Sequence, residues 1–447
     1  MFDALINYSL KKRELMVLVL LGLIGSGVYS LLSLPIDAVP DVTNVQVMAL
    51  TSAPAMGPAE VEQFITIPVE NAMNGIPLIK EVRSFSQFGI SGVTIIFEDG
   101  TDIYWARQQV GERLNLVRSE IPQEFGQPEM GPIATGLGEV YQFEVRNADD
   151  SPNPRSLMEL RTILDWEVAR KLKSVPGVVE VNPLGGELKT YEVELDPYRL
   201  HARGIALNQL YEAIRRNNAN AGGGYIQRNG ELRVIRGVGL IDDLKKLEEV
   251  ILAATPTGTP IYVRDVGTVR FAPMIRQGAA TRDGRGEAVT AIAYLLAGEN
   301  GRVVVNRIKE KVKEIQKTLP EGVVIDPYYD RSHLIEKTID TVARNLAEGG
   351  VLVIAVLLLL LGNLRAGLIV ALAIPLSMLF AGNLMLAFGI AGSLMSLGAI
   401  DFGLIVDSAV IVIENCVSRL AHAGPNQPTL DVVRRATLEV RRPVVFG

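Results

Sequence analysis

The stretch Ala399-Ile-Asp401-Phe-Gly-Leu-Ile-Val-Asp407-Ser-Ala-Val-Ile-Val-Ile-Glu414-Asn415 places three carboxylates in an otherwise apolar run. A run of this length and hydrophobicity predicts a helix that crosses a membrane. A charged carboxylate near the bilayer centre costs about 2.5–3.5 kcal/mol on insertion scales. Such a residue is therefore expected to carry ions, move protons or pair with a buried cation, and the stretch indicates a transporter.

The three acids are expected to form two stripes on this helix. At about 100° per residue, Asp407 and Glu414 lie about 20° apart and roughly 10 Å apart along the axis. Asp401 lies about 120° from Asp407 around the helix. We predict that Asp401, Asp407 and Glu414 form a proton relay, with Asp407 near mid-membrane. The alternatives are a permanent ion pair or, for Glu414 near the membrane boundary, a position that faces water.

Three other segments have the length and composition of membrane spans. With the carboxylate helix, the predicted spans are 15–34, 349–364, 366–388 and 394–417. Gly389-Ile-Ala-Gly-Ser393 is expected to form the turn between the last two. The first segment also resembles a signal peptide, but it is longer than a usual apolar signal region and no clear cleavage site follows it. Four helices are therefore predicted.

Basic residues predict the orientation of these helices, because cytoplasmic segments are enriched in Lys and Arg. They are Lys11, Lys12, Arg13, Arg365, Arg419, Arg434, Arg435, Arg441 and Arg442. All fall on one side if the N-terminus is cytoplasmic, and the segment of about 300 residues after the first span then lies outside the cytoplasm. The last residues, Arg441-Arg-Pro-Val-Val-Phe-Gly447, resemble the start of a fifth span, so a fragment of a longer protein is expected.

The segment outside the membrane predicts two similar units of strands and helices. The first has strands at 45–52, 81–88 and 92–98 and helices at 59–74 and 102–121. The second has strands at 140–145, 178–182, 190–194, 289–295 and 323–328 and helices at 156–173 and 303–318. Repeated βαβ units of this kind predict ferredoxin-like subdomains. The predicted fold class is an α+β membrane protein with transmembrane helices and a region of ferredoxin-like βαβ subdomains.

Composition excludes some classes and leaves others open. The chain has 447 residues, which is too long for one ordinary domain, and its net charge of −6 gives no basic footprint for nucleic acid. The single cysteine, Cys416, excludes an internal disulfide. The loop Asn217-Asn-Ala-Asn-Ala-Gly-Gly-Gly224 lacks the Lys-Ser/Thr ending of a phosphate-binding loop, and we expect it to be flexible or to adopt unusual backbone angles. Asp326 and Asp330 are expected on a solvated face.

Several motifs resemble one family of transporters. They are Pro40-Asp-Val-Thr-Asn-Val-Gln-Val47, Pro58-Ala-Glu-Val-Glu-Gln-Phe64, Tyr104-Trp-Ala-Arg-Gln-Gln109, Asn217–Tyr225, Tyr329-Asp-Arg-Ser332 and the carboxylate stretch from Asp401 to Asn415. Together they resemble the N-terminal half of a resistance–nodulation–division (RND) efflux pump, most closely the heavy-metal branch of cobalt–zinc–cadmium type. The resemblance covers essentially the whole chain, and its most specific part is the presence of all three acids.

The resemblance implies a homotrimer in the inner membrane of a Gram-negative cell, with a large periplasmic region. Its partners would be a periplasmic adaptor (membrane fusion) protein and an outer-membrane channel, and proton influx would drive export of divalent metal cations. No cofactor is implied. The implied domains are a first transmembrane helix (1–34), porter subdomain 1 (35–133), porter subdomain 2 (134–184 and 271–340), a docking-type insertion (185–270), transmembrane helices 2–4 (341–418) and a cytoplasmic segment leading to a fifth helix (419–447).

Two other functions remain open. The branch usually has Gly where this chain has Ser408, and multidrug members commonly have Asp there, which weakens a precise choice of substrate. Multidrug pumps bind drugs in a Phe-rich pocket, but between residues 134 and 340 this chain has only Phe143 and Phe271. A membrane-anchored scaffold is the other alternative, and it does not explain the acids. The metal ligands are expected mostly outside this chain and are not assigned.

Overall fold

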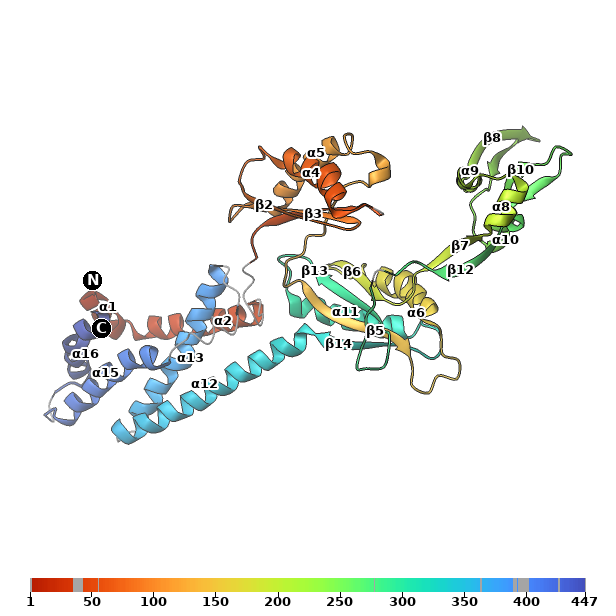
Figure 1. The fold of residues 1–447 in the computed structure, drawn as a ribbon. Coiled ribbons are helices and arrows are strands. Elements are labelled where there is room, and N and C mark those ends of the chain that lie inside the picture. Colours follow the sequence, from red (N-terminus) through yellow and green to blue (C-terminus); the bar gives the residue numbers. More distant parts are fainter. Residues whose placement is uncertain are drawn as a thin grey trace.

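The structure is a computed structural model that describes residues 2–34, 43–54, 56–276, 278–361, 364–388, 392, 402–424 and 427–446. It contains a bundle of long helices, two units built on four-stranded sheets and a lobe that projects from the second unit (Figure 1). The turn predicted at 389–393 lies outside the described residues, apart from Gly392.

The first unit is a four-stranded antiparallel sheet covered by helices. Its strands are β1 (Gln46–Ser52), β2 (Ile79–Gln87), β3 (Ile90–Phe97) and β4 (Glu129–Met130), in the order β2-β3-β1-β4. Its helical elements are α3 (Pro58–Val61), η1 (Glu62–Thr66), α4 (Ile67–Met73), α5 (Ile103–Val117) and η2 (Gln123–Phe125). Alternate residues of β1 and β3, such as Val47, Val93 and Ile95, are buried against Ile65 and Leu114 of the helices. In β1 this alternation is the pattern of a sheet with one covered face, whereas β3 is buried on both sides over most of its length.

The second unit repeats this arrangement. Its strands are β5 (Glu139–Asn147), β6 (Val178–Gly185), β13 (Val289–Leu295) and β14 (Val323–Asp330), in the order β14-β5-β13-β6. Its helices are α6 (Leu157–Ile163), η3 (Leu164–Ala169), α7 (Arg170–Leu172) and α11 (Gly301–Gln316). Numbered within each unit, both sheets have the order 2-3-1-4, with a helix after the first strand and another after the third.

Capping residues explain where three of the predicted helices begin. Asp102 accepts a hydrogen bond from the backbone N–H of Trp105 at 2.7 Å. Ser156 and Glu159 form a reciprocal capping box, and Asn300 accepts from the N–H of Val303. Each side chain satisfies a backbone donor that has no partner within the helix. The helices predicted at 102–121, 156–173 and 303–318 are confirmed, and the π-helical elements η1 and η3 were not predicted.

The lobe is inserted between β6 and β13 and has its own small core. Its elements are β7 (Lys189–Leu195), α8 (Pro197–Arg203), α9 (Leu207–Asn217), β8 (Ala221–Arg228), β9 (Glu231–Gly237), α10 (Leu244–Glu248), β10 (Ile251–Ala254), β11 (Pro260–Tyr262), η4 (Val263–Asp265) and β12 (Gly267–Pro273). The antiparallel pair of β7 and β12 connects it to the second unit (Figure 1). The buried residues of the lobe core include Leu210, Leu247 and Val263.

The loop predicted over residues 217–224 is replaced by a strand in its second half, but the expected unusual backbone angle is present at Gly224, whose φ is +78°. Residues 221–228 form β8, which pairs with β9 from Ala221↔Gly237 to Arg228↔Glu231. Every residue of both strands is exposed. Glycine weakens a strand mainly because it has no side chain to pack. Because every residue of the described hairpin is exposed, its glycines remove little packing, and the strands are joined by their backbone pairing.

The bundle contains six described helices. They are α1 (Phe2–Lys11), α2 (Arg13–Ser33), α12 (Arg331–Leu361), α13 (Leu364–Ala387), α15 (Phe402–Ala421) and α16 (Thr429–Phe446). The span predicted at 349–364 forms most of the C-terminal half of α12, which follows β14 without an intervening loop. Both chain ends lie at the end of the bundle away from the sheets (Figure 1).

Two of the described helices have the length and hydrophobicity of a membrane span. They are Arg13–Ser33 in α2 and Arg365–Ala387 in α13. The spans predicted at 349–364 and 394–417 each include positions outside the described residues, namely 362–363 and 394–401. They remain predictions.

Candidate functional site

The carboxylate helix α15 packs against α13 through small and branched apolar side chains. Val370 and Ile374 of α13 are buried, and Ala409, Val410 and Ile413 of α15 pack on them. The three residues of α15 lie at helical spacings of one, three and four, so they form one side of the helix. This side fixes the rotation of α15 about its axis relative to α13.

A second side of α15 is joined to α16 by polar contacts. The Asn415 amide donates to the backbone oxygen of Ala436 at 2.8 Å. The Arg419 guanidinium donates to both carboxylate oxygens of Glu439, with an Nε–Oε2 distance of 3.1 Å. Cys416, which follows Asn415 in the sequence, is buried and is a free thiol. These contacts join the C-terminal end of α15, which is predicted to be cytoplasmic, to α16 and fix how the two helices align along their axes.

The structure describes the three predicted relay residues to different extents. Asp401 lies outside the described residues, and position 407 is described on α15 without its side chain. Glu414 is exposed. By helical geometry, positions 407 and 414 lie about 100° from the side that packs on α13 and about 135° from the side that contacts α16. The predicted stripe therefore occupies a third side of α15, and its role in proton transfer remains a prediction.

A compact polar cluster joins the second sheet unit to α12. Asp330, the last residue of β14, accepts from the backbone N–H of Ser332 at 2.9 Å and from its hydroxyl at 2.7 Å. Lys309 of α11 forms an ion pair with Asp330 and donates to the Ser332 hydroxyl at 2.6 Å. Three elements, α11, β14 and the start of α12, therefore meet at one capped helix end.

The expectation that Asp326 and Asp330 lie on a solvated face is wrong. The Asp330 side chain is only 17% exposed, and Asp326 pairs with Arg146 and Arg282 at 3.0 Å each. Burial alone would raise the pKa of Asp330, but hydrogen bonds from Lys309 and Ser332 hold that pKa below its usual value. Asp330 is thus an ionised structural residue.

A hollow of about 330 Å³ lies beside this junction. It is lined by Gly136, Leu137, Glu139, Gln142, Tyr329, Arg331 and Leu334. The Glu139 carboxylate accepts from the Gln142 amide at 3.0 Å and from the Tyr294 hydroxyl at 3.2 Å. The buried Arg331 side chain donates to the backbone oxygen of Leu137. The hollow is therefore lined by the Glu139 carboxylate, which is oriented by two hydrogen bonds, and by the Arg331 guanidinium, which is hydrogen-bonded to the backbone.

Two tyrosines on the same sheet remain protonated near this carboxylate. Burial, reinforced by Asp330 and Asp326, raises the pKa of Tyr141 to about 12. Burial and the neighbouring Glu139 also raise the pKa of Tyr294. Tyr294 is therefore a hydrogen-bond donor to Glu139 at any physiological pH. Glu139 can attract a cation, but within the described part of the chain no three His, Cys, Asp or Glu side chains converge to hold a metal ion.

Glu139 was not predicted as a site residue. Gln142 is a near neighbour on the same strand, but Tyr294 and the lining residue Arg331 come from segments that only the fold brings beside Glu139. The sequence offered one signal, a charged residue at the start of a predicted strand, and that signal is common on protein surfaces.

The family model described as AcrB/AcrD/AcrF matches residues 5–447 of the chain. The chain belongs to this family. Its members are RND efflux pumps, and the resemblance to the heavy-metal branch that the motifs indicated is confirmed.

The curated relatives of this RND chain include two that are 44% identical to it over 463 residues. They are the cation efflux system protein CzcA of Alcaligenes sp. (strain CT14) and the cobalt-zinc-cadmium resistance protein CzcA of Cupriavidus metallidurans. Each alignment covers 100% of this chain and 43% of the relative. A solved heavy metal efflux pump (crystal form II) has a TM-score of 0.87 and 37% identity, over 99% of this chain and 43% of that chain. The chain thus spans about 43% of the length of these relatives.

Proposed function

We propose that the protein exports divalent heavy-metal cations of the zinc, cobalt, cadmium and nickel class in exchange for protons. The observation that carries the proposal is 44% identity, over the whole chain, to a cobalt-zinc-cadmium resistance protein. The three acids in one apolar stretch supply a coupling device that a binding protein or scaffold does not need. On this proposal the protein is a secondary active transporter and not an enzyme.

Asp407 is proposed as the central proton carrier, with Asp401 and Glu414 as further steps of the relay. The exposed position of Glu414 supports access to protons from water. Positions 407 and 414 lie on a side of α15 that faces neither α13 nor α16. This placement supports contact of the two acids with another helix of the complete protein. Moving one proton down the membrane potential releases roughly 2.3 kcal/mol per 100 mV, which provides the driving force.

We further propose an inner-membrane location with four spans from this chain. α2 and α13 are supported by their length and hydrophobicity, and α12 and α15 are assigned by their place in the same bundle. Both chain ends lie at the bundle end opposite the sheets. Basic residues such as Lys11, Arg365 and Arg434 favour the cytoplasm for that end. The sheets and the lobe would then lie in the periplasm.

The two sheet units are proposed to be ferredoxin-like porter subdomains. Their βαββαβ order and the strand order 2-3-1-4 support this assignment. The lobe is proposed as the docking segment that meets the adaptor protein and the outer-membrane channel. It has its own core, and exposed side chains such as Tyr198 and Tyr211 are available for a partner. The exposed β8–β9 hairpin supports assembly into a homotrimer, because its apolar side chains are largely accessible to a partner surface.

The decisive experiment measures metal uptake into everted inner-membrane vesicles that contain the complete protein. Zinc, cobalt, nickel and cadmium are tested under an imposed proton gradient, with Asp407→Asn and Ser408→Gly as variants. We expect gradient-dependent uptake by the native protein and a loss of about 100-fold or more in Asp407→Asn, the effect of removing a proton-transfer group. Ser408→Gly restores the residue that the branch usually has, and it should retain uptake.

Other outcomes would redirect the proposal. If the native protein moves none of these ions but expels hydrophobic organic compounds, the multidrug alternative is correct. If Asp407→Asn transports as well as the native protein, the acid is structural and the relay assignment fails. Copper(I) is tested in the same vesicles, and uptake of copper(I) alone would place the protein with exporters of monovalent metals.

A further inference from the structure

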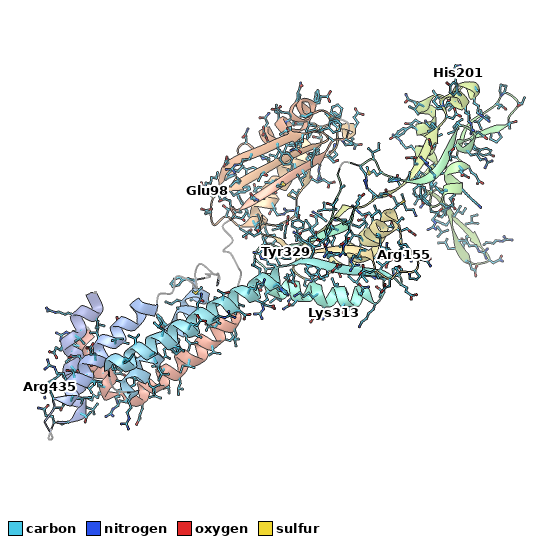
Figure 2. All side chains as sticks on the ribbon, turned by 60° about the horizontal axis from the view of Figure 1, so that its bottom comes forward. Glu98, Arg155, His201, Lys313, Tyr329 and Arg435 are labelled. Atoms are coloured by element: carbon cyan, nitrogen blue, oxygen red, sulfur yellow. The ribbon has the colours of Figure 1, made fainter. Side chains whose placement is uncertain are left out.

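The short helix α1 is fixed across α16 at the end of the bundle away from the sheets. Asp3 of α1 pairs with Arg441 at 3.0 Å, and Asn7 accepts from the Arg434 guanidinium at 3.4 Å. Only Lys12 separates α1 from α2, the first candidate membrane span. Figure 2 shows Arg435 of α16 at this same end. The contacts thus hold two helices side by side next to the start of a membrane span.

These contacts gather several cations for which the described part of the chain holds no acidic partner. Residues four apart share a helix face, so Lys11 lies one turn beyond Asn7, the residue that Arg434 contacts. We define the basic cluster as Lys11, Lys12, Arg13, Arg434 and Arg435. All five side chains are exposed, and within the described chain none forms an ion pair. The nearest acids in sequence, Glu14 and Asp431, are also exposed and also form no ion pair there.

Two other arginines at this end form ion pairs, unlike the members of the basic cluster. Arg441 pairs with Asp3, and Arg419 pairs with Glu439. Concentrating like charges is unfavourable unless counter-ions approach. The cluster adjoins Leu15, where the apolar run of α2 begins, and therefore lies at the depth of phospholipid headgroups when α2 spans a bilayer. Lys and Arg are the side chains that bind phosphate oxygens.

We propose that the basic cluster binds the phosphate group of an acidic phospholipid, such as phosphatidylglycerol, in the leaflet at the chain's N-terminal side. The inference rests on the proposed membrane placement but not on the proposed cargo. A bound lipid would neutralise the repulsion between α1 and α16 and hold the two helices together. Because Asn415 and Arg419 join α16 to α15, the lipid would also steady the end of the carboxylate helix.

The test uses the complete protein, purified in a neutral detergent, and titrates it with phosphatidylglycerol or phosphatidylcholine. Native mass spectrometry counts bound lipids, and Tm is followed in parallel. The variant Lys11→Gln/Arg434→Gln/Arg435→Gln is compared with the α11 variant Arg302→Gln/Lys313→Gln/Lys317→Gln, which removes three exposed cations from α11 and the residue that follows it. We expect phosphatidylglycerol to bind the native protein and the α11 variant alike. Binding to the cluster variant should be about 100-fold weaker, at about fivefold for each cation removed.

Each contrary result has a defined meaning. Equal binding of both lipids by the native protein, or equal loss in both variants, would overturn the site. Stabilisation by glycerol 3-phosphate at the same concentration would show that the cluster recognises soluble phosphate and not lipid. A cluster variant with a lower Tm before any lipid is added is replaced by Arg434→Lys/Arg435→Lys, which keeps the charges and should retain binding. Metal uptake measured on the same samples reports on the proposed cargo independently of the lipid result.

Discussion

At the scale of single residues, Asp330 shows how one carboxylate can fix the junction between two parts of the molecule. Its side chain caps α12 through Ser332 and pairs with Lys309 of α11. Because β14 runs directly into α12, these bonds fix the direction in which the long helix leaves the sheet. The carboxylate thus has two separable roles, as a helix cap and as the partner of a lysine.

Substitution separates the two roles of Asp330. Asn can still cap the helix, so Asp330→Asn should lose only the ion pair, while Asp330→Ala should lose both contacts. We expect losses in the free energy of unfolding of about 1 kcal/mol for Asn and about 2–3 kcal/mol for Ala at pH 7. The folded-state pKa of Asp330 lies below its unfolded value of about 3.9. The ion-pair contribution is therefore complete above that value and lost as the pH falls through the folded pKa.

Thermal unfolding of the complete protein between pH 7 and pH 3 measures this prediction. The Tm difference between native protein and Asp330→Asn should shrink as the solution becomes more acidic. A constant difference over the whole range would mean that ionisation of Asp330 contributes nothing. Asp283→Asn serves as the control, because that carboxylate is 63% exposed and should show little effect at any pH.

At the scale of helices, α2 and α13 are held together by small residues and a polar bridge. A methyl group on Gly27 would lie 2.5 Å from Cβ of Leu379, so the two backbones approach closely at this point. Next to it, Ser30 donates to the Asn383 side chain at 2.7 Å, and the Asn383 amide donates to Ser26 at 3.2 Å. Small residues with interhelical hydrogen bonds are a common means of helix association in membranes.

Gly27→Leu should therefore destabilise the protein, while Gly22→Leu on the same helix should not. Nothing lies within 4 Å of a methyl group built on Gly22. The expected cost for Gly27→Leu is about 1–3 kcal/mol from overpacking. Tm in detergent measures the difference, with both variants expressed in the complete protein. Equal Tm values for the two variants would show that α2 and α13 do not pack as described.

Elements could be predicted from the sequence where residues close together in the chain determine them. The helix at 102–121 was predictable because Ala106, Val110 and Leu114 repeat on one side and Asp102 caps it. The strand of the β8–β9 hairpin was missed because glycine was taken as a sign of a loop. The hollow at Glu139 could not be predicted, since Tyr294, which bonds to Glu139, and the lining residue Arg331 both lie more than 150 residues further along the chain. The relay residues were predicted from three acids in one apolar stretch and from the resemblance, and their roles stay a prediction.

At the scale of the whole molecule, the β8–β9 hairpin is the feature that a single chain does not explain. Tyr225 and Val234 are cross-strand partners, 71% and 77% exposed. An isolated two-stranded hairpin is at best marginally stable in water, and apolar pairs on its surface favour contact with another surface. The proposed homotrimer supplies such a surface from a neighbouring copy.

Replacing Tyr225 and Val234 by Ser should therefore weaken the trimer without weakening the protomer. Because both side chains are mostly exposed and pack only across the hairpin, we expect the unfolding free energy of the protomer to change by less than about 0.5 kcal/mol. The trimer should dissociate at concentrations at least tenfold higher than for the native protein, about 1.4 kcal/mol of association free energy. Mass photometry of the complete protein over a dilution series measures this. Tyr198→Ser, which removes an 87% exposed tyrosine from α8 of the same lobe, is the matched control and should leave the trimer intact. If both variants dissociate alike, the lobe surface as a whole is responsible, and if neither does, the hairpin meets a different partner.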